Sequence, residues 1–158
     1  MLDTAPDNSL RIERLSPKAA SVIETFATEV VEAFKDYRSS ALGQESLGKC
    51  FNSDPKRDWI NNRRVRAKKK LARLLLAKDR TTPPEHLREL AVGDIALNYL
   101  SLTHSHLVFG VLLEGVSDLI QARDLYVQAK SIAIECLGAR HSVTKSIRSV
   151  VEEISCFE

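Results

Sequence analysis

Residues 118–144, DLIQARDLYVQAKSIAIECLGARHSVT, decide the fold of this chain. Apolar side chains recur in this stretch every three or four residues, a spacing that places them on one side of an α-helix. They are Leu119, Ala122, Leu125, Tyr126, Ala129, Ile132 and Leu137. Ser117 or Asp118 can cap the start of the helix, and Gly138 suits the position after its end, which needs a left-handed backbone. The stretch predicts a helix over about 118–137, followed directly by a last helix over about 141–155.

The same periodicity continues towards the N-terminus, and no segment alternates as a β-strand does. Proline follows Ser16 and Asp54, the cap-plus-proline start of a helix. Further helices are expected over 17–38, 55–78, 83–102 and 106–114. The sequence thus predicts an all-α protein of about six helices in antiparallel hairpins. Residues 1–15 read as a flexible tail and 16–158 as one helical domain, with a divergent hairpin over 16–80 and further hairpins over 83–155.

The helix over 83–102 is expected to be central and well covered. One side of it carries Leu87, Leu90, Ala91, Ile95 and Tyr99. Thr82 stands three residues before Glu85, which is capping-box spacing. The polar run Ser101–Ser105 is expected to end this helix.

Composition is that of one intracellular globular domain. The chain has 158 residues, 44% of them hydrophobic and 28% charged, enough to bury a core. Uninterrupted apolar runs such as Leu74–Ala77 and Leu107–Leu113 are far shorter than a membrane span, and the N-terminus lacks the order of a secretory signal. Three widely spaced cysteines (Cys50, Cys136 and Cys156) favour a reducing compartment, either cytoplasm or nucleus, and a packing role.

Charge is distributed unevenly along the chain. Eleven basic and two acidic residues between Lys56 and Arg80 give this segment +9. Twelve basic and nineteen acidic residues elsewhere give −7. A basic segment on an acidic body indicates an interaction surface more specifically than the net charge of +2 does.

Residues 122–144 also form a motif, A-x-x-L-Y-x-x-A-x-x-I-x₄-L-G-x-x-H-S-V. It resembles the second helix and exit turn of tetratricopeptide repeats of the kinesin-light-chain type. The resemblance covers roughly residues 105–154 and aligns Gly110 with the small position of the repeat's first helix. His106 and Ser142 depart from the usual large apolar residue and proline. Because no 34-residue repeat runs along the chain, one repeat fused to divergent hairpins, cut from a longer protein, is the expectation.

The resemblance implies a non-enzymatic scaffold that binds a peptide or helix of a partner protein in an apolar groove. The groove-facing candidates are His104, Leu107, Val111 and Glu114. The competing interpretation is that Leu107 and Val111 simply belong to the core.

The basic helix over 55–78 is the second candidate site. Its cations are Arg63, Arg64, Arg66, Lys68, Lys69, Lys70 and Arg73. Three interpretations remain open: a solvated face, a surface for nucleic acid or an acidic protein tract, and a bipartite nuclear import signal. The last would join Lys56-Arg57 to Lys68-Lys69-Lys70 and requires an extended chain. Arg64 falls on the apolar line of the helix, so its first turns, with Trp59, are expected to protrude from the core.

Chemistry-bearing motifs are absent from the sequence: it has no glycine-rich phosphate loop, nucleophile elbow or metal-binding HExxH or CxxC pair. His104 and His106 are two residues apart, so on a helix they point in different directions and do not share a metal. The sequence therefore predicts no enzyme, cofactor or metal site.

Overall fold

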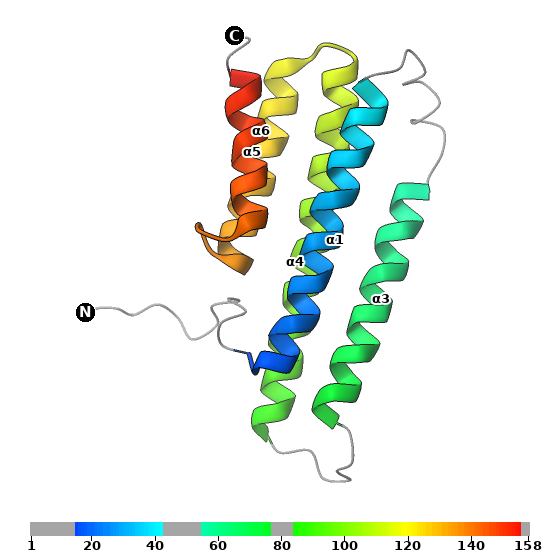
Figure 1. The fold of residues 1–158 in the computed structure, drawn as a ribbon, viewed down its shortest axis with the longest axis vertical. Helices are drawn as coiled ribbons and strands as arrows, with labels where there is room; N and C mark the ends of the chain where they lie inside the picture. The colour runs from blue at the N-terminus through cyan, green and yellow to red at the C-terminus, as the bar shows by residue number, and fades with distance from the viewer. Residues whose placement is uncertain (1–14, 43–54, 77–83, 156–158) are drawn as a thin grey trace, which may run out of the picture.

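The computed structural model describes residues 15–42, 55–76 and 84–155, which form five helices. These are α1 (Pro17–Leu42), α3 (Pro55–Leu76), α4 (Pro84–Gly115), α5 (Leu119–Leu137) and α6 (Ser142–Ser155). The prediction of an all-α protein is confirmed for these residues. Figure 1 shows the helices running side by side along the long axis of an elongated bundle.

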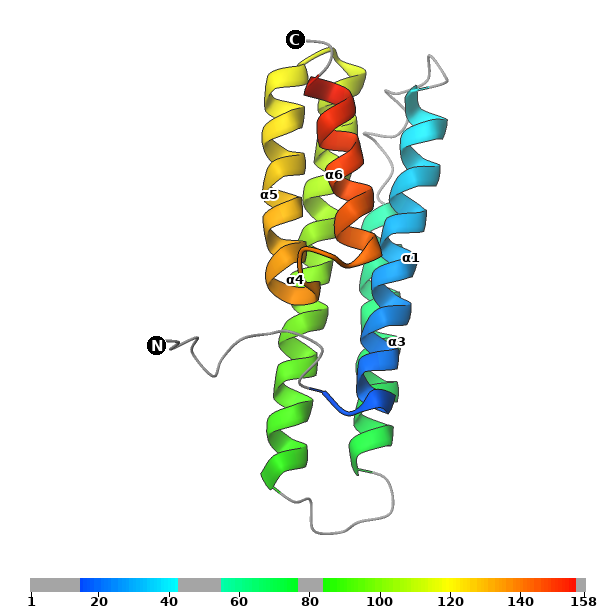
Figure 2. The ribbon, with the colours of Figure 1, turned by 60° about the vertical axis from the view of Figure 1, so that its left-hand side comes forward.

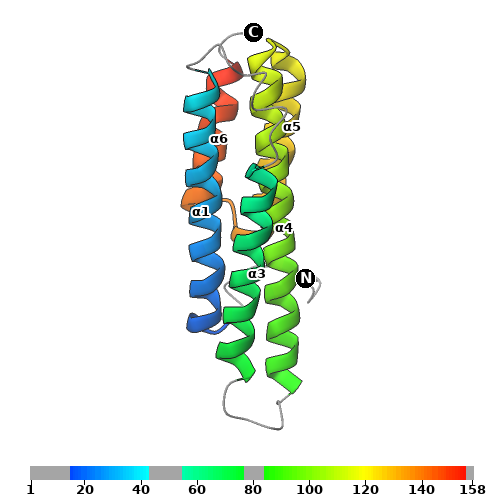
Figure 3. The same ribbon diagram turned by 90° about the vertical axis from the view of Figure 1, so that its right-hand side faces the viewer.

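The longest helix, α4, is the spine of the bundle because α1, α3 and α5 all pack against it. In Figures 2 and 3, α3 lies beside the half of α4 that comes first in the chain, while α5 and α6 lie beside the other half. Helix α1 runs along the bundle and also contacts α3 and α6. The interior between these helices is almost wholly apolar, with Phe26, Phe34 and Tyr126 its largest fully buried side chains.

Helix α4 is one continuous helix, so the predicted break at Ser101–Ser105 is wrong. The two helices predicted over 83–102 and 106–114 are therefore one helix. The hydroxyls of Ser101, Thr103 and Ser105 donate to the carbonyl oxygens four residues earlier, at 2.9, 2.9 and 3.3 Å. Because each hydroxyl finds its acceptor inside the helix, a polar run can continue the helix instead of ending it.

The buried side of α4 is not the predicted one. It consists of Ala96, Leu97, Leu100, Thr103, His104, Leu107 and Val111. Leu87 and Ile95, expected to be covered, are 53% and 41% exposed. Because α4 has apolar residues on several sides, its sequence pattern alone does not determine which side is buried. The packing of α1 and α5 against it does.

Three predicted helix ends agree with local geometry. The Ser16 hydroxyl accepts from the amide of Ala19 at 3.3 Å, and the Asp118 carboxylate accepts from the amide of Gln121 at 3.2 Å. Gly138 has φ of 96°, the left-handed half of backbone space that glycine tolerates best. The predicted caps at Asp54 and Thr82 lie outside the described residues.

Residues Leu87–Gly115 of α4 are long and apolar enough, by length and composition alone, to cross a membrane. The segment is apolar because α4 is central in the bundle: one of its sides is buried, and a further apolar side is exposed.

Candidate functional site

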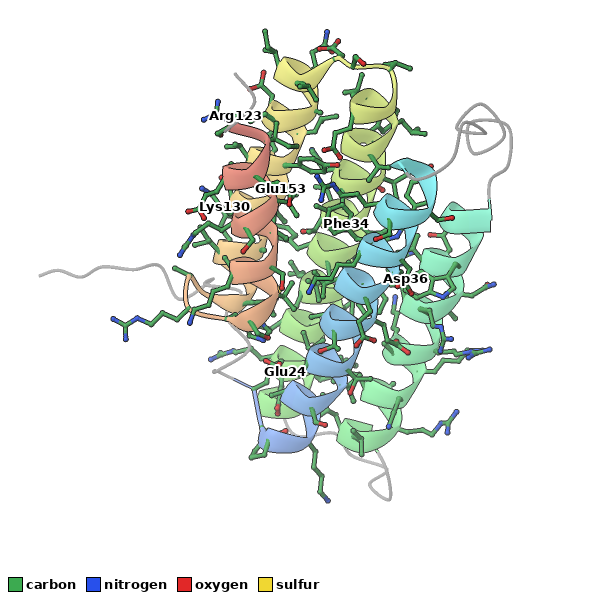
Figure 4. All side chains as sticks on the ribbon, turned by 45° about the horizontal axis from the view of Figure 1, so that its top comes forward. Glu24, Phe34, Asp36, Arg123, Lys130 and Glu153 are labelled. Carbon is green, nitrogen blue, oxygen red and sulfur yellow. The ribbon has the colours of Figure 1, made fainter. Side chains whose placement is uncertain are left out.

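The α3 helix presents most of its cations on the outside of the bundle. Figure 4 shows nitrogen-tipped side chains of α3 projecting away from the other helices. Arg66, Lys69, Lys70 and Arg73 are exposed, and among the described residues none of them has an ion-pair partner. We call these four residues the α3 basic face. They follow one another at i, i+3, i+4 and i+7, which gathers them on one side of the helix.

The other three predicted cations of α3 are engaged within the bundle. Arg63 pairs with Glu29 of α1 at 3.2 Å. Lys68, 56% exposed, lies 3.4 Å from Asp94 of α4. The seven candidates are therefore divided between α3's internal contacts and its outward face.

Arg64 tilts towards α4, where its guanidinium donates to the side-chain oxygen of Asn98. The described helix packs on α1 and α4 from Ile60, which is buried, onward. The expectation that the first turns of this helix protrude is therefore wrong from Ile60 onward. The Asn98 side chain accepts one of the hydrogen bonds of the Arg64 guanidinium, whose charge would otherwise keep it away from the core. The side chains of Lys56 and Arg57 lie outside the described residues.

Trp59 is half-buried between two neighbours. Its ring lies 5.6 Å from the ring of His104, and the guanidinium carbon of Arg63 lies 5.7 Å from its centroid. Because these contacts already engage Trp59, less of its aromatic surface is left on which a nucleic-acid base could stack.

The four groove candidates face the interior, which corrects the expectation of an open peptide groove there. His104 is 2% exposed, and Leu107 and Val111 are fully buried. The Glu114 carboxylate accepts two hydrogen bonds from Arg38 of α1, both at 2.8 Å. The physical reason is α1 itself: it packs along the side of α4 that a stacked repeat would leave open.

Glu114 is the centre of a partly buried polar network. The Tyr126 hydroxyl donates to it at 2.8 Å, and Arg38 also donates to Glu153 of α6 at 2.7 Å. These hydrogen bonds, Glu114 first, raise the pKa of Arg38. Burial, together with the negative charge of Glu114, raises the pKa of Tyr126. The network joins α1, α4, α5 and α6, which makes it a structural tie.

Tyr126 also fixes how closely α4 and α5 approach. A Cβ added at Gly110 would lie 2.3–2.7 Å from three atoms of the Tyr126 ring. That ring packs edge-on against Phe34, with centroids 5.7 Å apart, and Phe34 points from α1 into the interior (Figure 4). The absence of a side chain at Gly110 therefore lets the tyrosine ring lie on the α4 backbone.

The reactive side chains His141 and Cys136 lie in structural contacts. His141 contacts both carboxylate oxygens of Glu24, at 2.7 and 2.8 Å, and Cys136 is buried, which raises the pKa of its thiol to about 12. Within the described ranges no group of three metal-ligating side chains is assembled. Cys50 and Cys156 lie outside those ranges.

Shallow hollows open on the surface beside α1, and two of them also involve other helices. One, of about 440 Å³, is lined by Pro17, Lys18, Ser21, Val22, Lys70 and Leu74. The other, of about 320 Å³, is lined by Phe34, Lys35, Arg38, Ser39, Val150 and Glu153. Both are open to solvent, and neither gathers a set of catalytic side chains.

A further surface was missed by the sequence reasoning: the outer side of α4 exposes Leu87, Ile95, Leu102 and Phe109. The signal was present as a seven-residue spacing from Ile95 to Leu102 to Phe109. It was obscured because α4 carries apolar residues on several sides, and the side chain of Phe109 is 60% exposed.

No protein-family profile matches the chain, and neither a curated protein nor a solved structure matches it.

Proposed function

We propose that this protein is a non-enzymatic binding module that docks on a polyanion through the α3 basic face. One observation carries the proposal: four cations of α3 point to solvent without an ion-pair partner among the described residues. Exposed single cations are ordinary, but four on one side of a helix within a segment of +9 form an electrostatic footprint.

The chemistry is charge neutralisation. Seven residues separate Arg66 from Arg73, so the face extends for about 10 Å along the helix. Each phosphate that such a cation neutralises releases counterions, which lowers the slope of log K against log salt by about 0.9 for duplex DNA. With Trp59 engaged by His104 and Arg63, binding relies on backbone charge and is indifferent to base sequence. An acidic protein tract offers the same anionic chemistry, and the experiment below separates the two sources.

The test is fluorescence anisotropy with a labelled 20-base-pair duplex at several salt concentrations between about 50 and 200 mM. We expect a salt slope near −3 to −4. Lys69→Gln/Lys70→Gln should make the slope shallower by about 2. Arg140→Gln/Lys145→Gln removes two exposed cations from the α5–α6 turn and the start of α6, and this matched control should leave the slope unchanged.

Three outcomes count against the proposal: no binding at low salt, binding that is independent of salt, or equal weakening by both double variants. A polyglutamate peptide of equal charge is the second probe. If it binds as tightly as the duplex, the acidic tract is the better description of the ligand. If the peptide binds at least tenfold more weakly than the duplex, phosphate is the better description of the ligand.

A second part of the proposal concerns the α4–α5 hairpin, which we propose is a tetratricopeptide-like pair used as a scaffold. The approach of Tyr126 to Gly110, together with buried Ala122 and Ala129, supports it. The peptide-binding role is not proposed for the side of α4 that contains Leu107 and Val111, because α1 covers it. Gly110→Val should separate the hairpin and lower the melting temperature, whereas an unchanged melt would remove this support.

The location that fits this chemistry is intracellular, in the nucleus or the cytoplasm. Lys68, Lys69 and Lys70 are part of a helix, whereas an import receptor reads an extended chain. We therefore propose that any nuclear targeting by these residues requires α3 to unwind. Nuclear accumulation of a fluorescent fusion that is lost with Lys68→Gln/Lys69→Gln/Lys70→Gln would support it, and unchanged accumulation would reject it.

A further inference from the structure

The outer side of α4 carries a regular apolar pattern that nothing in the described bundle covers. Ile95, Leu102 and Phe109 follow one another at seven-residue intervals and are 41%, 48% and 60% exposed. Val116 continues the seven-residue spacing just past the end of the helix. Leu87, eight residues before Ile95, adds an exposed apolar side chain near the start of α4, and both are more than half exposed. We call these five residues the α4 heptad stripe. Large apolar residues repeating every seven positions are typical of the seam between two helices of a coiled coil.

The positions between the large residues fit such a seam. Ala91, Asn98, Ser105 and Leu112 lie four residues before Ile95, Leu102, Phe109 and Val116, as the second set of seam positions does in a heptad. Two of the four are small, so a second backbone can come close.

The two flanks of the stripe differ in their exposed charged side chains. On one flank, Arg64 and Lys68 of α3 contact Asn98 and Asp94. On the other flank the end of α5 lies at the same level, because the Cys136 thiol is 3.8 Å from the carbonyl oxygen of Ala96. Its neighbour Glu135 is exposed. Exposed Lys68, which also approaches Asp94, therefore lies on one side of α4 and exposed Glu135 on the other, level with each other.

This arrangement is self-complementary under one symmetry. A two-fold axis parallel to α4 places the α3 flank of one copy against the α5 flank of the other, so that Lys68 of one copy faces Glu135 of the second copy. A two-fold axis perpendicular to α4 instead places like flanks together. Closed two-fold dimers are the commonest homo-oligomers, and opposite charge at a rim favours the parallel form.

The area is also appropriate. The exposed parts of the five stripe residues present on the order of 500 Å² of apolar surface, at the upper end of what monomeric proteins expose in one patch. A stable dimer buries about 800 Å² per partner. A dimer would draw the remainder from the α3 and α5 flanks, which include exposed Val65.

We infer that the α4 heptad stripe packs against the same stripe of a second copy, forming a parallel homodimer. The inference is independent of polyanion binding, since the α3 basic face lies on the outer side of α3, away from α4.

The mass in solution tests the inference. Sedimentation equilibrium at about 50 μM should give twice the 17.7 kDa of one chain. Leu102→Glu/Phe109→Glu should give the monomer mass with an unchanged helical circular dichroism signal, because both side chains are already exposed. Ile120→Glu is the matched control: this side chain is 70% exposed but lies on α5 outside the stripe, so the variant should remain dimeric.

The orientation has its own readout. In a chain carrying Cys50→Ser, Cys136→Ala and Cys156→Ser, we expect Ala91→Cys to form an intermolecular disulfide on mild oxidation, because Ala91 meets itself only when the helices are parallel. A dimer without this crosslink overturns the parallel arrangement. A monomeric wild type, or a Leu102→Glu/Phe109→Glu variant that stays dimeric, overturns the dimer itself. A monomer that cosediments with phosphatidylcholine vesicles through the stripe would assign the stripe to a membrane surface and likewise overturn it.

Polyanion binding distinguishes this inference from the proposed function. The Leu102→Glu/Phe109→Glu monomer should still bind the duplex, with a per-chain salt slope unchanged, whereas Lys69→Gln/Lys70→Gln should remain dimeric. Loss of the dimer and loss of duplex binding are therefore separate results.

Discussion

Replacing Gly110 with alanine tests the close contact between α4 and α5. The new Cβ would lie 2.3 Å from Tyr126 Cε1 and 2.7 Å from two further ring atoms, far inside the 3.5–4.0 Å at which carbon atoms pack best. The ring has little freedom to retreat, because it is fully buried, abuts Phe34 and donates its hydroxyl to Glu114.

Two opposing effects determine the size of the change. Alanine in a helix interior is favoured over glycine by about 0.5–1 kcal/mol. Overpacking a well-packed core costs about 1–3 kcal/mol. The clash should win, leaving Gly110→Ala destabilised by about 0.5–2 kcal/mol, which corresponds to a melting temperature lower by roughly 2–6 °C for a domain of this size.

Thermal and urea unfolding followed by circular dichroism measure this change. The sign should reverse in a Tyr126→Leu background, where the ring is gone: there Gly110→Ala should stabilise by up to about 1 kcal/mol through helix propensity. If Gly110→Ala raises the melting temperature in the wild-type background, or if the two backgrounds respond alike, the tight contact between α4 and α5 is wrong.

Three further changes probe other parts of the bundle. Leu107→Asp places a charge in the fully buried interior and should cost about 4 kcal/mol or more, whereas Ile120→Asp, on the surface, should melt close to wild type; equal melts in a thermal scan would mean that Leu107 is not in the core. Asp118→Ala removes the cap on the amide of Gln121 and should cost about 1 kcal/mol in urea unfolding, while Asp118→Asn should restore most of it. Burial raises the pKa of Cys136 from 9.0 to about 12, so its contribution to stability is complete below pH 9 and is lost as the pH rises towards 12. Cys136→Ala should therefore flatten the fall of unfolding free energy over that range by up to about 1.4 kcal/mol per pH unit, and an identical pH profile would contradict the burial of the thiol.

Helical periodicity was enough to predict the all-α class and the ends of several helices, because capping and the i, i+4 pattern are local properties. The cap at Asp118 and the positive φ of Gly138 followed from residue type alone. The continuity of α4 did not, because whether Ser101–Ser105 breaks a helix depends on whether its hydroxyls bond to the carbonyls of the previous turn.

The candidate sites also depend partly on the sequence and partly on how the helices pack. The concentration of cations over 56–80 is a property of the sequence, but which of them remain available depends on Glu29, Asp94 and Asn98, which other helices bring to α3. The groove residues were misassigned because a family alignment specifies one hairpin and says nothing of α1, which covers Leu107 and Val111. Since Ile95, Leu102 and Phe109 are as apolar as the core, only the placement of the neighbouring helices reveals that they are exposed.

Lysine footprinting tests the central claim, polyanion docking through the α3 basic face, most directly. The chain is acetylated briefly at low salt with and without the 20-base-pair duplex, and the modification of each lysine is read by mass spectrometry. We predict that the duplex protects Lys69 and Lys70 at least fivefold and leaves Lys145 unchanged. Equal protection of all three lysines, or protection of Lys145 alone, would contradict the assignment of binding to α3.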